Sequence, residues 1–132
     1  MKNIKQYYKE LGKLVYAVAA ADGAVQPEEK EKLHQFVLKE MAYHEQSVDS
    51  SGMNQAFYVD FEFDATEEKH PASTEIAKSY TRFVHANYEP NDEALIKNSL
   101  QLIEAVALAY SKKNEKNIID NIRQEMKEIS KV

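Results

Sequence analysis

Residues 14–33 read LVYAVAAADGAVQPEEKEKL and join two apolar segments through a short polar corner. Before the corner, apolar residues recur at spacings of three and four, which predicts a helix over about residues 3–21 with one buried stripe: Ile4, Tyr7, Leu11, Leu14, Val15 and Val18. Gly23 would end this helix, because glycine tolerates positive φ. Pro27 would begin the next helix, because its missing N–H has no partner at the first helical position.

The corner itself contains three acidic residues, Asp22, Glu28 and Glu29, which have two interpretations. In the structural one, Gln26 is the N-cap and Glu29 falls three residues later, where a capping box places its carboxylate on the Gln26 N–H. Asp22 would then accept hydrogen bonds from the other exposed amides of the helix. In the functional one, the three carboxylates and a carbonyl of the turn hold a hard cation, Ca²⁺ or Mg²⁺.

Composition favours a soluble all-α protein with one domain over residues 1–132. Hydrophobic residues make up 43% and charged residues 30% of the chain, and glycine and proline number only three each, too few for the turns of an all-β fold. The absence of cysteine excludes disulfides and thiolate metal sites and favours a reducing, cytoplasmic setting. No apolar run is long enough to predict a membrane span.

Four further helices are expected, over about residues 27–45, 73–87, 91–109 and 114–130. Asn91 is the expected N-cap of the third of these and Asn114 of the fourth. The helix over 91–109 is apolar around most of its circumference, which predicts that it lies at the centre of the fold. These helices, with the first one, define a compact all-α bundle of about five main helices.

Two stretches of the chain echo each other. LVYAVAAA (14–21) matches LIEAVALA (102–109), and each is followed by a short polar loop and another amphipathic helix. This repetition predicts two pseudo-repeated helix hairpins, over 1–46 and 91–130, that pack face to face through their alanine-rich stretches. The second hairpin lacks the Asp-Gly pair of the first, so a helix corner does not by itself require those residues.

A central insertion, residues 47–72, departs from the helical pattern. FYVDFEFD (57–64) alternates apolar and acidic residues, which predicts an extended segment. A lone strand leaves its backbone groups unpaired, so it would need a short hairpin partner, a symmetry mate in a homodimer or a place along the helices. The spacing of its acids is similar to that of a calcium loop, but Ala65 and Pro71 occupy the two anchoring positions, so this match fails.

The negative charge of the chain is concentrated around this insertion. Residues 49–75 contain seven acids and one base, whereas the other 15 acids are balanced by 16 bases. The overall net charge of −5 speaks against nucleic acid as a partner. The acids of this segment are expected to form the solvated face of the predicted strand. The alternative is that the acidic segment docks a basic protein partner through Asp60, Glu62, Asp64, Glu67 and Glu68.

The stretch over residues 14–33 resembles the TerB-like family, which is named for bacterial tellurite-resistance proteins. The resemblance rests on an alanine-rich helix ending in Ala-Asp-Gly at 21–23, on Val25, and on the acids that open the next helix. It extends over residues 11–41 and partly over 95–129, but not over 47–72. It implies an all-α bundle without catalytic activity and a role in stress response through metal ions and protein partners. Family members have been proposed to bind divalent cations near this turn, which implies Asp22, Glu28 and Glu29 here.

Three functions follow as hypotheses. The first is a non-enzymatic cytoplasmic TerB-like module that acts as an interaction or stress-response adaptor. The second is a divalent-cation sensor at the corner, and the third, ranked last, is a metal-dependent hydrolase. The sequence contains no nucleophile elbow, phosphate loop or dinucleotide motif, so no pattern indicates an enzyme. Glu40 and His44, four residues apart, could share a metal but are expected to be ordinary surface residues.

Overall fold

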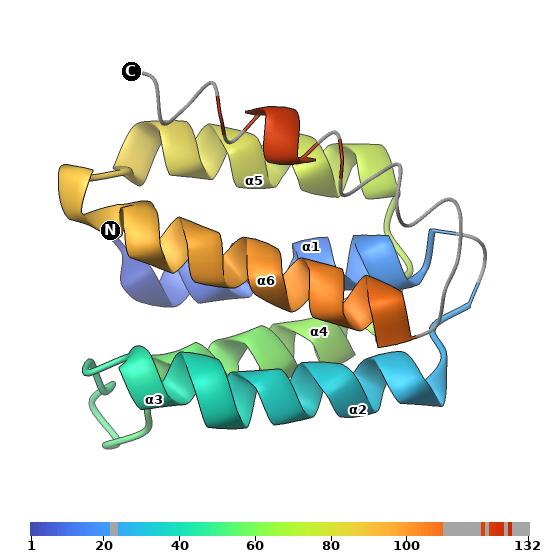
Figure 1. The fold of residues 1–132 in the computed structure, drawn as a ribbon, viewed down its shortest axis with the longest axis horizontal. Coiled ribbons are helices and arrows are strands. Elements are labelled where there is room, and N and C mark those ends of the chain that lie inside the picture. Colours follow the sequence, from blue (N-terminus) through green and yellow to red (C-terminus); the bar gives the residue numbers. More distant parts are fainter. Residues whose placement is uncertain (22–23, 110–119, 121, 126, 128–132) are drawn as a thin grey trace.

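A computed structural model of the chain describes residues 1–21, 24–109, 120, 122–125 and 127, which form a compact all-α bundle (Figure 1). The longer helices are α1 (Ile4–Ala19), α2 (Pro27–Phe36), α4 (Tyr58–Lys69), α5 (Ser73–Asn87) and α6 (Glu93–Ala109). A π-helical turn (Val37–Met41) and the short α3 (Ala42–His44) prolong α2, and 3₁₀ turns precede α4 (Gln55–Phe57) and α6 (Pro90–Asp92). Within the described ranges the only β-type pairing is an isolated bridge between Val48 and Asn54.

Helix α1 is the central helix of this bundle. It packs against α4, α5 and α6, and 11 of its 16 residues are buried, against six of 17 in α6. The prediction that the helix over 91–109 is central is therefore wrong. Gly12, Ala17 and Ala19 are all buried on α1. Because such small side chains let neighbouring helices approach closely from several sides, α1 can be surrounded, whereas α6 packs mainly across α1 and α2.

The extended segment predicted over residues 57–64 is helical in the structure. Residues Tyr58–Lys69 form α4, whose side against α1 buries Val59, Phe63 and Thr66. These three lie at spacings of four and three, so the apolar positions of the alternating pattern also satisfy a helical period. Phe61, which alternation placed with them, is half-exposed. No strand in this part of the chain requires a partner, so the reason for expecting a homodimer through this segment disappears.

The helix ends agree with the expected capping at α2 and differ at α6. The Gln26 N–H donates to Glu29 Oε1 over 2.8 Å, and Pro27 is the first residue of α2, as predicted. At α6 the cap is not Asn91 but a second capping box, in which the Glu89 N–H donates to Asp92 Oδ2 over 2.8 Å. Pro90 causes the difference, because it begins a 3₁₀ turn one residue ahead of Asn91.

Several sequence predictions lie outside the described residues. They are Asp22 and Gly23 at the corner, Asn114 as a cap, and most of the helix expected over 114–130, so beyond α6 only residues 120, 122–125 and 127 of the second hairpin are described. The described part of the expected helix lies against α5 and α6. Ile122 is buried, Glu125 accepts a hydrogen bond from Thr81, and Arg123 pairs with Glu104.

A chain of buried hydroxyl groups connects α1, α5 and α6. Ser99 Oγ donates to the Leu95 carbonyl over 2.8 Å, Tyr7 Oη lies 2.6 Å from Ser99 Oγ, and Tyr80 Oη lies 2.8 Å from Tyr7 Oη. Each hydroxyl has one hydrogen. Because that of Ser99 is used on Leu95, Tyr7 must donate to Ser99 and Tyr80 to Tyr7. Burial raises the pKa of Tyr7 to about 12 and also raises that of Tyr80.

None of the helices within the described ranges combines the length and the apolar character needed to cross a lipid bilayer.

Candidate binding sites

A groove runs between α2 and α4 and encloses about 510 Å³. Its floor is apolar, formed by Leu33, Phe57 and Phe63, and Phe61 stands at its edge with 52% of its surface exposed. Phe61 therefore extends the apolar surface of the floor to the exposed edge of the groove. Charged residues of both helices complete the lining: Lys30, Glu31, His34, Asp60 and Asp64.

The structure brings together four of the five acids predicted to bind a partner. Asp60, Asp64, Glu67 and Glu68 are spaced four, three and one residues apart on α4, so they share one side of the helix. Glu62 lies on the other side, against α1, where its Cβ would be 3.1 Å from a Cβ carbon placed on Gly12. The acidic face next to the groove therefore consists of Asp60, Asp64, Glu67 and Glu68.

Two of these acids are paired with α2. Glu67 Oε1 lies 2.6 Å from Lys30 Nζ, and Asp60 Oδ2 lies 3.3 Å from His34 Nδ1. Burial raises the pKa of Asp60, an effect that the neighbouring His34 opposes. Asp64 and Glu68 are exposed and form no hydrogen bond or ion pair with any described residue. Asp64 lines the groove and Glu68 follows one helical turn later on the same side of α4, so both negative charges are available to a ligand.

The loop before α4 is held by its own acidic residue. Asp49 accepts hydrogen bonds from the Ser51 hydroxyl over 2.6 Å and from the Tyr58 hydroxyl over 2.7 Å. These bonds, that of Ser51 first, lower the pKa of Asp49. Lys5 Nζ in turn lies 4.7 Å from the centre of the Tyr58 ring, a cation–π distance. Asp49 therefore positions Tyr58 at the start of α4, and its carboxylate is used within the fold.

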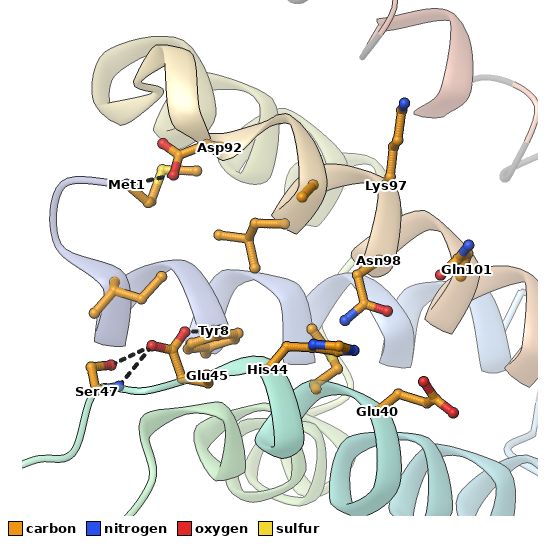
Figure 2. A pocket seen from close by; sticks show the side chains of 14 residues that line it. Met1, Tyr8, Glu40, His44, Glu45, Ser47, Asp92, Lys97, Asn98 and Gln101 are labelled. Atoms are coloured by element: carbon orange, nitrogen blue, oxygen red, sulfur yellow. Dashed lines mark hydrogen bonds and ion pairs between the residues drawn. The ribbon is translucent and has the colours of Figure 1, made fainter.

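A second and larger hollow lies between the first turns of α1, the π-helical turn with α3, and the first half of α6 (Figure 2). It encloses about 680 Å³. Helix α6 packs closely on α2 but makes few contacts with α3, and the two ribbons diverge towards α3 (Figure 1). The cleft lies where they diverge. The apolar part of its lining comes from Ile4, Tyr8, Met41 and Leu95.

The acids at the inner end of this cleft are used within the fold. Glu45 accepts hydrogen bonds from the Tyr8 hydroxyl and, over 2.6 Å, from the Ser47 hydroxyl. Burial, followed by the bond to Glu45, raises the pKa of Tyr8. Asp92 lies 2.6 Å from the amino group of Met1 (Figure 2). These contacts fix the walls of the cleft.

The polar side chains at the outer end have no such partners. Glu40 from the π-helical turn and Asn98 and Gln101 from α6 form no hydrogen bond or ion pair with any described residue. In Figure 2 Asn98 and His44 lie across the cleft from each other, with Glu40 and Gln101 beside them. Irregular π-helical turns occur frequently at functional sites, where they change the direction of a side chain.

At the corner between α1 and α2, the structure contains the capping contact that the structural interpretation of the three acids predicts. Glu29 is fully buried, and its Oε1 accepts the Gln26 N–H, whereas Glu28 is exposed. Asp22 lies outside the described residues, so the structure does not test whether the three acids come together. Among the residues that are described, no group of three or more His, Asp or Glu side chains is arranged to hold a metal ion. The cation site at Asp22, Glu28 and Glu29 stays a prediction.

Sequence reasoning missed Asn98 and Gln101. They are the two carboxamide side chains of α6, three residues apart, and that spacing places them on one side of the helix. The pair Glu40 and His44 was noticed, but the cleft in which it lies depends on how α6 crosses α2. No local pattern predicts such a crossing.

Comparisons of the chain with models of protein families, with curated proteins and with solved structures found no significant match. The resemblance to the TerB-like family therefore stays a prediction.

Proposed function

We propose that the chain is a non-enzymatic, cytoplasmic interaction adaptor that docks a basic, amphipathic helical segment of a partner protein in the α2–α4 groove. This proposal agrees with the adaptor role that the TerB-like resemblance implies. The partner's apolar side chains would cover Phe61 and enter the groove, and its Lys or Arg residues would face the acidic face of α4.

The single observation that supports the proposal most is the position of Phe61 beside Asp64 and Glu68. An exposed aromatic ring offers apolar area to bury, at about 25 cal/mol per Å². The two adjacent carboxylates have no partner among the described residues and select a cationic ligand. The combination favours a ligand that is both apolar and basic.

A helical ligand is expected because residues of α2 and α4 line the two sides of the groove. An amphipathic helix can lay its apolar face into a groove of this kind with side chains three and four residues apart. The charge pairs would be at the exposed rim, where each contributes about 0.2–1 kcal/mol and is weakened by salt. We therefore expect moderate affinity with strong salt dependence.

The test uses a fluorescent helical peptide made of leucine and lysine, with leucines at spacings of three and four. Its binding is measured by anisotropy against the wild type, the groove variant D64N/E68Q and the control variant E75Q/D120N. Both variants remove two exposed negative charges, so any effect of net charge is the same. We expect D64N/E68Q to raise the Kd about two- to tenfold and the control to leave it near the wild-type value.

Two further reagents test the specificity of the groove. Phe61→Ser should weaken binding as well, because it removes apolar area at a half-exposed position without opening the core. A peptide with glutamate in place of lysine should not bind. Equal weakening by D64N/E68Q and E75Q/D120N would contradict the proposal, since it would mean that the peptide responds only to overall charge.

A further inference from the structure

We infer that the cleft between α1, α3 and α6 is a second binding site, and that its ligand is an extended peptide segment with an apolar residue next to a Lys or Arg. The inference is independent of the α2–α4 groove, which lies on other helices and selects a helical ligand. It depends on which polar groups of the cleft are free, on the floor beneath them and on the charge at the rim.

The free polar groups determine the kind of ligand. Asn98 and Gln101 carry primary amides, each with a carbonyl acceptor and N–H donors. A peptide group offers the complementary pair, one N–H and one C=O. A helical peptide uses these groups internally, whereas an extended peptide leaves them free. Two side-chain amides on one side of α6 are therefore suited to the backbone of an extended segment.

The charge at the rim determines which side chain the segment carries. Glu40 accepts hydrogen bonds only, and it has no ion pair with any described residue. The other carboxylates of the lining are occupied: Glu45 by Tyr8 and Ser47, and Asp92 by the amino group of Met1. Lys97, the cation at the rim, lies 3.4 Å from Glu93 on its own helix. Glu40 thus provides an unneutralised negative charge, which favours Lys or Arg on the ligand.

The floor provides the remaining contact. Ile4, Met41 and Leu95 line the cleft below the polar rim. A volume of about 680 Å³ lies within the range of sites that enclose most of a small ligand. Met41 also lets the floor adapt its shape, because methionine is unbranched and polarisable. One apolar side chain of the peptide can occupy this floor while the neighbouring peptide groups face Asn98 and Gln101.

The experiment uses three end-blocked pentapeptides with a central leucine. The first has lysine directly after the leucine, the second has norleucine in place of that lysine, and the third has N-methylated peptide bonds on either side of the leucine. Each is titrated into the ¹⁵N-labelled chain and followed by amide chemical shifts. We expect the first peptide to shift amides of residues 40–44 and 95–101, and N-methylation to weaken binding about three- to tenfold.

Variants of the chain show which residues of the cleft contact the peptide. Glu40→Gln should abolish the preference for lysine over norleucine and leave binding of the norleucine peptide unchanged. N98A/Q101A should weaken all peptides with intact N–H groups to the level of the N-methylated one, whereas the exposed Gln124→Ala should change nothing. The inference is overturned if the N-methylated peptide binds as well as the first, if E40Q keeps the lysine preference, or if no amide near the cleft shifts at millimolar peptide.

Discussion

Gly12 on α1 packs directly against the backbone of Val59 on α4. A Cβ carbon on residue 12 would lie 2.5 Å from the Val59 carbonyl oxygen and 3.2 Å from the Phe63 backbone nitrogen. Real Cβ atoms do not approach a carbonyl oxygen so closely, so only glycine allows this helix crossing. The contact fixes the position of α4, and with it the acidic face and the wall of the proposed docking groove.

Gly12→Ala should therefore destabilise the protein. The substitution gains about 1 kcal/mol from the higher helix propensity of alanine. It also forces α4 away from α1, and such overpacking costs about 1–3 kcal/mol or more when the clash is with backbone. We expect a net loss of about 1–2 kcal/mol in the free energy of unfolding, measured by urea denaturation followed by circular dichroism.

Lys78→Ala is the control for this experiment, because residue 78 is exposed on α5 and should change stability by no more than about 0.5 kcal/mol. If Gly12→Ala stabilised the protein, residue 12 would have free space beside it, and α4 would not pack where the structure places it.

Ser99→Ala should be more damaging than its small volume change suggests. It removes the acceptor of the buried Tyr7 hydroxyl, and an O–H left without a partner costs about 1–3 kcal/mol. Tyr80→Phe removes only the first donor of the chain and should cost about 0.5–1.5 kcal/mol. Thermal or chemical unfolding of both single variants and the double variant measures these costs and the coupling between them. Additive losses would show that the hydroxyls do not act as one chain.

The same tyrosines predict the response to alkaline pH. The pKa of Tyr7 is raised to about 12 in the folded state, whereas an unfolded tyrosine has a pKa of about 10. The folded state thus holds this proton more tightly, so its stability is complete below pH ~10 and is lost as the pH rises towards ~12. The loss from Tyr7 is about 3 kcal/mol. Tyrosinate absorbance should rise in two phases, the second coinciding with unfolding by circular dichroism; a single phase before unfolding would contradict the burial.

Features that depend on neighbouring residues were predictable from the sequence. The capping box of Gln26 and Glu29 and the start of α2 at Pro27 were predicted and are present, because capping is decided within one helical turn. The bounds of α5 and the buried stripe of α1 were also predicted, since each has a helical period and clear breakers at its ends.

Features that depend on tertiary packing were not predictable from the sequence. The alternation around Val59 and Phe63 fits a strand, but the same two residues are four apart and fit a helix, and their contact with α1 decides between the two. The sequence identified the five acids of this segment as a group. That Glu62 lies on a different side from the other four became clear only because the segment is a helix. The cleft of Asn98 and Gln101 depends on the crossing of α6 over α2, which no local pattern encodes.

The cation hypothesis at the corner has a direct thermodynamic test in Glu29→Gln. If Glu29 only caps α2, glutamine keeps an acceptor oxygen for the Gln26 N–H, so the substitution should cost no more than about 1 kcal/mol, and the loss should be the same in EDTA and in millimolar Ca²⁺. A cation bound to the native state would raise the melting temperature of the wild type but not of the variant. Asp22→Asn is measured under the same conditions as a second variant. It would lose the stabilisation by the cation but keep the capping of α2 by Glu29. The cation site would be established if Ca²⁺ raised the melting temperature of the wild type and both variants abolished this increase.

Binding of a basic helical segment in the α2–α4 groove can be tested by mapping amide chemical shifts. The ¹⁵N-labelled chain is titrated with the leucine–lysine helical peptide at low salt. We expect the largest shifts on both walls of the groove, in residues 30–34 and 57–68, and we expect them to be smaller at high salt and in D64N/E68Q. Shifts confined to other helices, or spread evenly over the chain with the same size in D64N/E68Q, would contradict it.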